Sequence, residues 1–325
     1  MVSEERLKQL KRQLAKLLSV EALSEEEIAS RVGINRTLTK RIVFSLREEG
    51  FHIVEQDNKL SLKLDKINFH DLSTKLRTRI LGRRMIFLEE ATSTMDVAKA
   101  RYSMEGLVVL AEKQTIGRGR RGKNWYSPGG GLWFSVILRP RNPPKYTSLI
   151  GLFSSLATAE AIENLTDLKT SLKWPNDIYV NDRKVCGVIT EAIYEIGEIA
   201  SAIVGIGINN NIPKEKFPEE LREEATSLME ESGYPVPPLT LLCRILERLE
   251  KYYNVFLRGR YREILELWKN KTDIIGSWAQ IYFDDGYICG KIIDVDEIGR
   301  LVLESETGET MYFNTGTIDK IRMLG

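Results

Sequence analysis

The residues Gly117-Arg118-Gly119-Arg120-Arg121-Gly122 spell G-x-G-x-x-G, the pattern of the turn that holds dinucleotides in a Rossmann fold. That turn needs a strand running directly into the glycines and a helix opening from them. Here the apolar run Leu107–Leu110 ends several residues earlier, and Pro128-Gly129-Gly130-Gly131 downstream excludes a helix. The stretch instead predicts a glycine loop with four cations between Gly117 and Lys123 and no acid. We expect such a loop to stay mobile until an anion, such as a phosphate, neutralises it.

The length and composition indicate a folded protein of several domains. The chain has 325 residues, of which 42% are hydrophobic and 29% charged. Its net charge of +1 means that nucleic-acid binding would need a local basic patch. Three separated cysteines and two histidines predict neither a zinc site nor a disulfide framework. Since neither a signal peptide nor an apolar run of roughly 20 residues occurs, we expect a cytoplasmic protein without membrane contact.

Changes in sequence texture predict an α+β protein with three domains, residues 1–65, 66–272 and 273–325. The middle domain alternates apolar strands with helices, which is typical of an enzyme domain with one mixed sheet. In the last domain, turns such as Glu297-Ile298-Gly299-Arg300 and Glu306-Thr307-Gly308 separate short strands. That spacing predicts a small barrel of SH3-like size.

The first domain has the pattern of a winged helix-turn-helix. Leucines from Leu7 to Leu18 recur at helical spacing, and Ser24 with Glu27 forms a capping box that opens a second helix. A third helix is predicted over Asn35–Glu48, followed by a hairpin between Phe51 and Leu64.

The charges of this domain are segregated. Five bases and no acid lie between Arg31 and Arg47, whereas four acids and no base lie between Glu21 and Glu27. On a helical wheel, four residues of the third helix point away from its apolar stripe, which predicts a DNA-recognition face: Arg36, Thr37, Lys40 and Arg47. The alternative is a solvated helix face in a protein–protein module.

Polar residues of the middle domain gather in a few short motifs. Besides the arginine loop these are Lys173-Trp174-Pro175-Asn176-Asp177, Asn181–Gly187 with Lys184, and the strand Gly205–Asn209, whose glycines allow a ligand close to the backbone. The helix start at Ser93-Thr94 offers hydroxyls and free N–H groups, and Gln114 adds an amide.

Each motif alone has an ordinary explanation as a turn, a bulge or a solvated lysine. Together they lack a Ser-His-Asp set, a metal cluster, a Walker loop and a G-x-S-x-G elbow. Cations and neutral polar groups remain, which favour stabilisation of a phosphoryl or adenylate species.

These motifs, in this order, resemble the biotin–protein ligases that carry an N-terminal winged helix and also repress transcription. The most specific parts are Gly117–Trp125, Pro128–Phe134, Lys173–Asp177 and Asp182–Gly187. The resemblance implies that ATP activates biotin as biotinyl-5'-AMP, with Mg²⁺ arriving on ATP. A lysine of a biotin carboxyl carrier protein then receives the biotin. It further implies operator DNA as a partner and a homodimer that the ligand promotes.

The resemblance also assigns roles to residues of this chain, with no protein ligands for a metal. It implies that the catalytic residues are Lys184, Arg118 and Asp177. It implies that the biotin-binding residues are Ser93, Thr94, Met95, Gln114, Arg118, Gly119, Arg120, Lys184, Gly187 and Gly205. It implies that the nucleotide-binding residues are Arg118, Arg121, Lys173, Asn176, Asp177 and Asn209.

Two features depart from the family pattern. Met95 stands where the family usually has asparagine, and a thioether cannot replace the donors of an amide. The segment 210–227, expected to fold over the adenylate, contains no tryptophan. Two other functions stay open: a lipoate–protein ligase, against which Gln114 and the triple glycine argue, and a ligand-sensing transcription factor without ligase activity.

Overall fold

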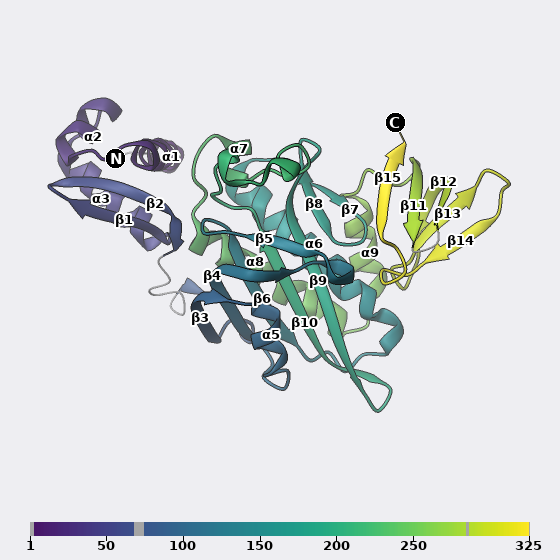
Figure 1. The fold of residues 1–325 in the computed structure, drawn as a ribbon. Helices are drawn as coiled ribbons and strands as arrows, with labels where there is room; N and C mark the ends of the chain where they lie inside the picture. Colours follow the sequence, from purple (N-terminus) through teal and green to yellow (C-terminus); the bar gives the residue numbers. More distant parts are fainter. Residues whose placement is uncertain (1–2, 68–74, 284–285, 325) are drawn as a thin grey trace.

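A computed structural model describes residues 3–67, 75–283 and 286–324 of the chain. An N-terminal helical unit and a C-terminal antiparallel sheet lie at opposite ends of a central domain built on a mixed sheet (Figure 1). The α+β class and the order of the three parts are as expected from the sequence. Within the described residues, no helix combines the length and apolar character needed to cross a bilayer.

The N-terminal unit contains three helices and a two-stranded hairpin: α1 (Glu4–Val20), α2 (Glu25–Val32), α3 (Arg36–Glu48), β1 (Phe51–Gln56) and β2 (Lys59–Ile67). The capping box predicted at Ser24 is confirmed, because its hydroxyl accepts from the Glu27 N–H and the Glu27 carboxylate accepts from the Ser24 N–H. The leucine stripe of α1 packs against α3 and the hairpin as the core of this unit.

The central sheet has eight strands: β3 (Arg84–Ala91), β4 (Leu107–Arg118), β5 (Asn124–Ser127), β6 (Leu132–Leu138), β7 (Ser171–Lys173), β8 (Asp177–Val180), β9 (Arg183–Glu195) and β10 (Glu198–Ile208). Their order is β3-β4-β6-β10-β9-β8-β7, with β5 paired on β4. β3 and β4 run parallel, and the other pairs are antiparallel. The predicted mixed sheet is therefore confirmed.

Each face of this sheet carries helices: a short helix lies on one face, and a layer of three longer helices lies on the other. The short helix α5 (Thr94–Lys99) packs over β4, β6 and β10. The opposite face is covered by α6 (Thr147–Thr166), which is itself packed under α8 (Pro238–Leu257) and α9 (Tyr261–Lys269). Because α6 is buried between the sheet and two helices, it is apolar on nearly all sides. On the side that carries α5, the β9 residues Ile189, Glu191 and Ile193 are only half-buried.

The C-terminal sheet contains β11 (Trp278–Phe283), β12 (Gly286–Val295), β13 (Leu301–Ser305), β14 (Thr310–Phe313) and β15 (Lys320–Leu324). The strand order is β14-β13-β12-β11-β15, and every pair is antiparallel. Its inward-facing residues, such as Ala279 and Ile281, join the same core as the central domain.

One expectation about the arginine loop is wrong. β4 does not end near Leu110 but continues to Arg118, so a strand does run into the glycines. The strand continues because β5 pairs with it, Gly117 opposite Trp125 and Arg118 opposite Asn124. The predicted lack of a helix holds, since the loop consists of a single 3₁₀ turn, Arg120–Gly122, and then β5. The loop is thus the tip of a β-hairpin.

Candidate functional site

The strand registers place several of the predicted motifs in one row across the sheet. Lys173 pairs with Asp177, Asp177 with Gly187, and Gly187 with Gly207. Gly207 in turn pairs with Trp133 on β6. Three motifs that are far apart in sequence thus meet along one line, on the face of the sheet that carries α5.

A hydrogen-bonded polar cluster lies at the start of α5. The Thr94 N–H donates to Gln114 Oε1 at 2.8 Å, and Gln114 Nε2 donates to Ser127 Oγ at 2.9 Å. Thr94 Oγ1 lies 2.8 Å from Ser135 Oγ, and Ser93 caps the helix. The expected residues Ser93, Thr94 and Gln114 are brought together, but sequence reasoning missed Ser127 and Ser135. Their signal was weak, because single serines on strands are common.

Met95 lies in this region through packing rather than hydrogen bonding. Its side chain is buried, and a Cβ placed on Gly205 would come within 2.8 Å of Met95 Sδ. Gly205 therefore makes room for the thioether, which fills the sheet surface beside the polar cluster. The Met95 N–H donates to Ser93 Oγ at 3.3 Å. The side chain thus contributes apolar surface where an asparagine would contribute donors.

The ring of Trp125 covers the bare glycines of the row. A Cβ on Gly187 or on Gly207 would lie 2.9 Å or 2.6 Å from this ring. Trp125 Nε1 is buried and has no hydrogen-bond partner. Sequence reasoning missed Trp125. Trp133 is buried next to Trp125, and its Nε1 donates to the Pro128 carbonyl at 2.9 Å.

Lys184 sits at the edge of the same surface. Its Nζ lies 2.7 Å from Asp177 Oδ2 and 5.0 Å from the centre of the Trp125 ring. Its backbone is held on both sides, because its N–H donates to the Glu224 carbonyl and its carbonyl accepts from the Thr226 N–H. The buried amide of Asn209 donates to the Thr226 carbonyl at 3.0 Å. Lys184 and the segment after β10 are therefore fixed to each other.

The remaining residues of the Lys173–Asp177 motif have structural partners. Asn176 Nδ2 donates to the carbonyl of Val188 on β9, whose N–H donates back to the Asn176 carbonyl at 2.9 Å. Lys173 Nζ lies 3.9 Å from Asp182 and 4.1 Å over the Tyr179 ring. Both residues therefore lie next to the row of paired residues, and Asn176 hydrogen-bonds the edge of β9 at Val188.

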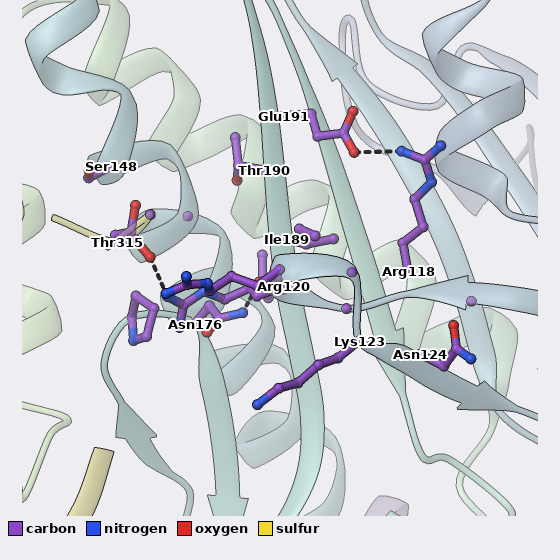
Figure 2. Close-up of a pocket in the computed structure, with 18 of the residues that line it drawn as sticks. Arg118, Arg120, Lys123, Asn124, Ser148, Asn176, Ile189, Thr190, Glu191 and Thr315 are labelled. Carbon is purple, nitrogen blue, oxygen red and sulfur yellow. Dashed lines mark hydrogen bonds and ion pairs between the residues drawn. The ribbon is translucent and has the colours of Figure 1, made fainter. Parts of the chain in front are cut away.

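The arginines of the loop point in different directions. Arg118 donates to Glu191 Oε1 at 2.8 Å and also contacts Asp96 on α5. Burial raises the pKa of Glu191, but hydrogen bonds from Lys99 and Arg118 outweigh this, so its pKa lies below its usual value. Figure 2 shows Arg118 turned toward Glu191 and Arg120 turned the other way, toward Thr315.

Arg120 and Arg121 join the loop to the C-terminal sheet. Arg120 donates to the carbonyls of Thr315 and Ile318, the latter at 2.9 Å, and Arg121 Nε lies 2.9 Å from Asp319. Burial lowers the pKa of the Arg120 guanidinium.

A cavity of about 550 Å³ opens beneath the arginine loop. It is bounded by residues 116–124 of the loop and its flanks, by the start of α6, by Asn176, by residues 188–191 of β9 and by Thr315 (Figure 2). The Gly119 N–H donates to the Lys123 carbonyl at 2.7 Å and closes the loop over this cavity. Its volume lies within the range of small-molecule sites.

The expected DNA-facing residues split into two groups. Arg36, Thr37 and Lys40 are exposed on α3, whereas Arg47 is half-buried and its Nε donates to the Ile53 carbonyl of the hairpin at 3.3 Å. Phe44 is also exposed on α3, with 66% of its surface accessible.

Two of these cations are paired with acids of α2. Arg36 lies 2.7 Å from Glu25 and 2.8 Å from Glu26, and Lys40 lies 3.6 Å from Glu25. The hydrogen bond that Arg36 donates to Glu25 raises the pKa of Arg36. The sequence places these acids and bases in separate segments, and the turn between α2 and α3 brings them into contact.

Comparisons with known proteins agree with this architecture. A model of the "Biotin/lipoate A/B protein ligase family" matches residues 87–209. The bifunctional ligase/repressor BirA of Bacillus spizizenii is 33% identical over 295 residues, which cover 89% of this chain and 91% of that protein. The bifunctional ligase/repressor BirA of Escherichia coli is 26% identical over 299 residues, 90% of this chain and 91% of that protein.

A solved structure is similar as well. The biotin protein ligase from Aquifex aeolicus in complex with biotin and ATP superposes with a TM-score of 0.66 at 31% identity. The superposition covers 74% of this chain and 100% of that chain. The chain therefore belongs to the biotin/lipoate A/B protein ligase family.

Proposed function

We propose that this protein is an ATP-dependent biotin–protein ligase that also acts as a biotin-responsive transcriptional repressor. One observation carries the ligase activity: the Thr94–Gln114 polar cluster, the glycines of the row and Lys184 lie on one face of the sheet. A donor-and-acceptor cluster at one end and a cation at the other suit a ligand with a polar ring and a carboxylate. The relative that is 33% identical over 89% of the chain bears the name bifunctional ligase/repressor.

In the first step, a carboxylate oxygen of biotin attacks the α-phosphorus of ATP. The bond from that phosphorus to the oxygen bridging to the β-phosphate breaks, and pyrophosphate leaves with the electron pair. Because two anions must meet, the step needs cations. We assign Lys184 to the charge that develops between carboxylate and α-phosphate, and Asp177, at 2.7 Å, to its orientation. Arg118 and Arg121 neutralise the phosphates after exchanging their present carboxylate partners.

In the second step, the ε-amine of a lysine on a biotin carboxyl carrier protein attacks the acyl carbon of biotinyl-5'-AMP. The acyl–oxygen bond to AMP breaks, AMP leaves, and an amide forms once the attacking nitrogen has lost its proton. A carboxylate is a poor electrophile, so the mixed anhydride made in the first step supplies the reactivity. We assign Arg118, Gly119 and Arg120 of the loop to enclosing this intermediate away from water.

On the nucleotide side we place Lys173, Asn176 and Asn209. Magnesium is proposed to enter with ATP, where it neutralises phosphate charge. Among the residues that the structure describes, no three His, Cys, Asp or Glu side chains gather as metal ligands. We propose that the phosphates of ATP, rather than a protein cage, hold this Mg²⁺ ion.

Biotin is favoured over lipoate by the composition of the polar cluster. Gln114 presents both an acceptor and donors, and Thr94, Ser127 and Ser135 add hydroxyls to the same network. A ureido ring has N–H donors and a carbonyl acceptor that can exchange with these hydrogen bonds, whereas a dithiolane ring has none.

For the repressor role, we propose that the N-terminal unit is a winged helix-turn-helix that places α3 in the major groove of operator DNA. The domains are proposed at 1–65, 66–272 and 273–325, the last an SH3-like barrel. A homodimer promoted by the adenylate would present two copies of α3 to two half-sites. Enzyme and operator would meet in the cytoplasm.

The test is to incubate the full-length protein with ATP and either biotin or lipoate, and to identify the adenylate by mass spectrometry. Biotinyl-5'-AMP and subsequent labelling of a biotin carboxyl carrier domain are expected. Lipoyl-AMP alone would favour the lipoate ligase. Biotin binding without adenylate or carrier labelling would favour a ligand-sensing transcription factor.

A further inference from the structure

The last strand of the N-terminal unit packs directly on the turn between β5 and β6. A Cβ on Gly129 would lie 2.9 Å from the Asp65 carbonyl, and one on Gly130 would lie 3.2 Å from the Leu64 carbonyl. Gly130 also has a φ of +102°, which other residues rarely adopt. Any side chain here would push the two segments apart, so the close contact of β2 with this turn depends on glycine.

A second contact joins β2 to the other arm of the same hairpin. Lys66 Nζ lies 2.7 Å from Glu112 Oε2, and Glu112 is only 8% exposed on β4. Glu112 precedes Gln114 of the polar cluster by two positions on the same strand. β2 therefore touches both strands that lead to the arginine loop: β4 through Lys66, and the end of β5 through Gly129.

A third element meets the same turn. The Asn211 N–H donates to the Gly130 carbonyl at 2.7 Å, and Asn211 Oδ1 accepts from the Val236 N–H at 2.7 Å. Asn211 begins the segment that runs past Lys184 through Glu224 and Thr226. The turn is thus the common contact of three segments: β5 from the arginine loop, residue 211 from the other segment at the site, and β2 from the N-terminal unit.

We propose that the Gly129–Gly130 turn, together with the Lys66–Glu112 ion pair, is the joint through which occupancy of the ligand site is communicated to the DNA-binding unit. The inference rests on the proposed function. β5 has only four residues, so a change at the arginine loop reaches the turn through one short strand. The turn has no side chains that could absorb the movement, and even a methyl group would not fit between it and β2. A shift of β2 reorients α3, because both belong to one core.

Amide hydrogen exchange on the full-length protein, with and without biotin plus ATP, tests this joint. In the wild type, ligand is expected to slow exchange in residues 117–127 and also in residues 59–66. Gly129→Ala and Lys66→Gln are expected to keep adenylate formation and the response of residues 117–127, but to lose the response of residues 59–66. Lys66→Gln serves as the second variant because it changes an exposed side chain and leaves the glycine backbone intact.

Lys63→Gln is the matched control, since it removes the same charge from an exposed position of the same strand. It should respond to ligand as the wild type does. If the wild type forms the adenylate but responds only in residues 117–127, the proposed joint is refuted and the ligase proposal stands. A retained response of residues 59–66 in both joint variants would also overturn it. Absence of any adenylate would instead refute the proposed function on which the joint rests.

Discussion

Replacing Lys184 by alanine is the most direct test of how this site acts on its substrates. Lys184 Nζ lies 2.7 Å from Asp177 and 5.0 Å from the Trp125 ring, and its side chain is 27% exposed. It is therefore a partly desolvated cation, held in place before the ligand arrives. The variant removes that cation and leaves the backbone contacts of residue 184 unchanged.

The expected loss can be worked from Coulomb's law. Two unit charges about 4 Å apart attract by about 4 kcal/mol when the effective dielectric constant is about 20. Asp177 and solvent screen part of this, so we expect a loss of about 3 kcal/mol in transition-state stabilisation, or about a hundredfold in the rate of adenylate formation. The fold should persist, because a partly exposed ion pair contributes about 1 kcal/mol or less.

The assay is pyrophosphate release at saturating biotin and ATP, with biotinyl-5'-AMP quantified in parallel and thermal unfolding recorded for each variant. Lys269→Ala is the matched control, because Lys269 is similarly buried and pairs with Asp294 at 2.6 Å on the helical side of the protein. It should keep the wild-type rate. An unchanged rate in Lys184→Ala, with the control also unchanged, would remove Lys184 from the mechanism.

Three further predictions follow from the contacts described above. Gln114→Leu leaves the Thr94 N–H without its acceptor and removes the donor to Ser127 Oγ, so it should raise the KM for biotin by about tenfold or more while the KM for ATP is unchanged; equal effects on both would contradict a biotin site here. Glu25→Gln combined with Glu26→Gln frees Arg36 and should tighten binding to mixed-sequence duplex DNA with a steeper salt dependence, as fluorescence anisotropy over a salt series would measure; weaker binding would show that these acids do not compete with phosphate. Glu191 has a pKa below its usual 4.5, so its charged form contributes stability above pH 4.5, and this contribution is lost as the pH falls through the lowered value. Thermal unfolding of Glu191→Gln against the wild type should show a difference at neutral pH that disappears in acid, and a constant difference would argue against an ionic role.

Local features could be predicted from the sequence because short-range chemistry determines them. The cap at Ser24 needs only its own side chain and the next three residues, and the leucines of α1 need only the helical period. The strands β6 and β10 are buried on both faces of the sheet. They are therefore continuous apolar runs, which can be recognised as strands in the sequence. β5 was missed because four residues of mixed character, Asn124–Ser127, carry no period of their own.

The sequence predicted which motifs form the site but not how their side chains contact one another. Ser93, Thr94 and Gln114 were expected together, and the structure adds Ser127 and Ser135 through long-range hydrogen bonds. The homodimer and the roles of individual site residues stay predictions, as does the mobility of the arginine loop.

By itself, the sequence determined the kind of chemistry available to this protein. Glycines, arginines and neutral polar groups, with few histidines, restrict the site to binding anions and stabilising charge. It also determined the order of the three parts, because hydrophobic periods and turn residues act over a few positions.

Only the tertiary structure decided which groups face one another. It placed Trp125 over bare glycines, paired Arg36 with acids of another helix, and set β2 against Gly129. These contacts join segments far apart along the chain, and packing of whole elements creates them, so no local pattern records them.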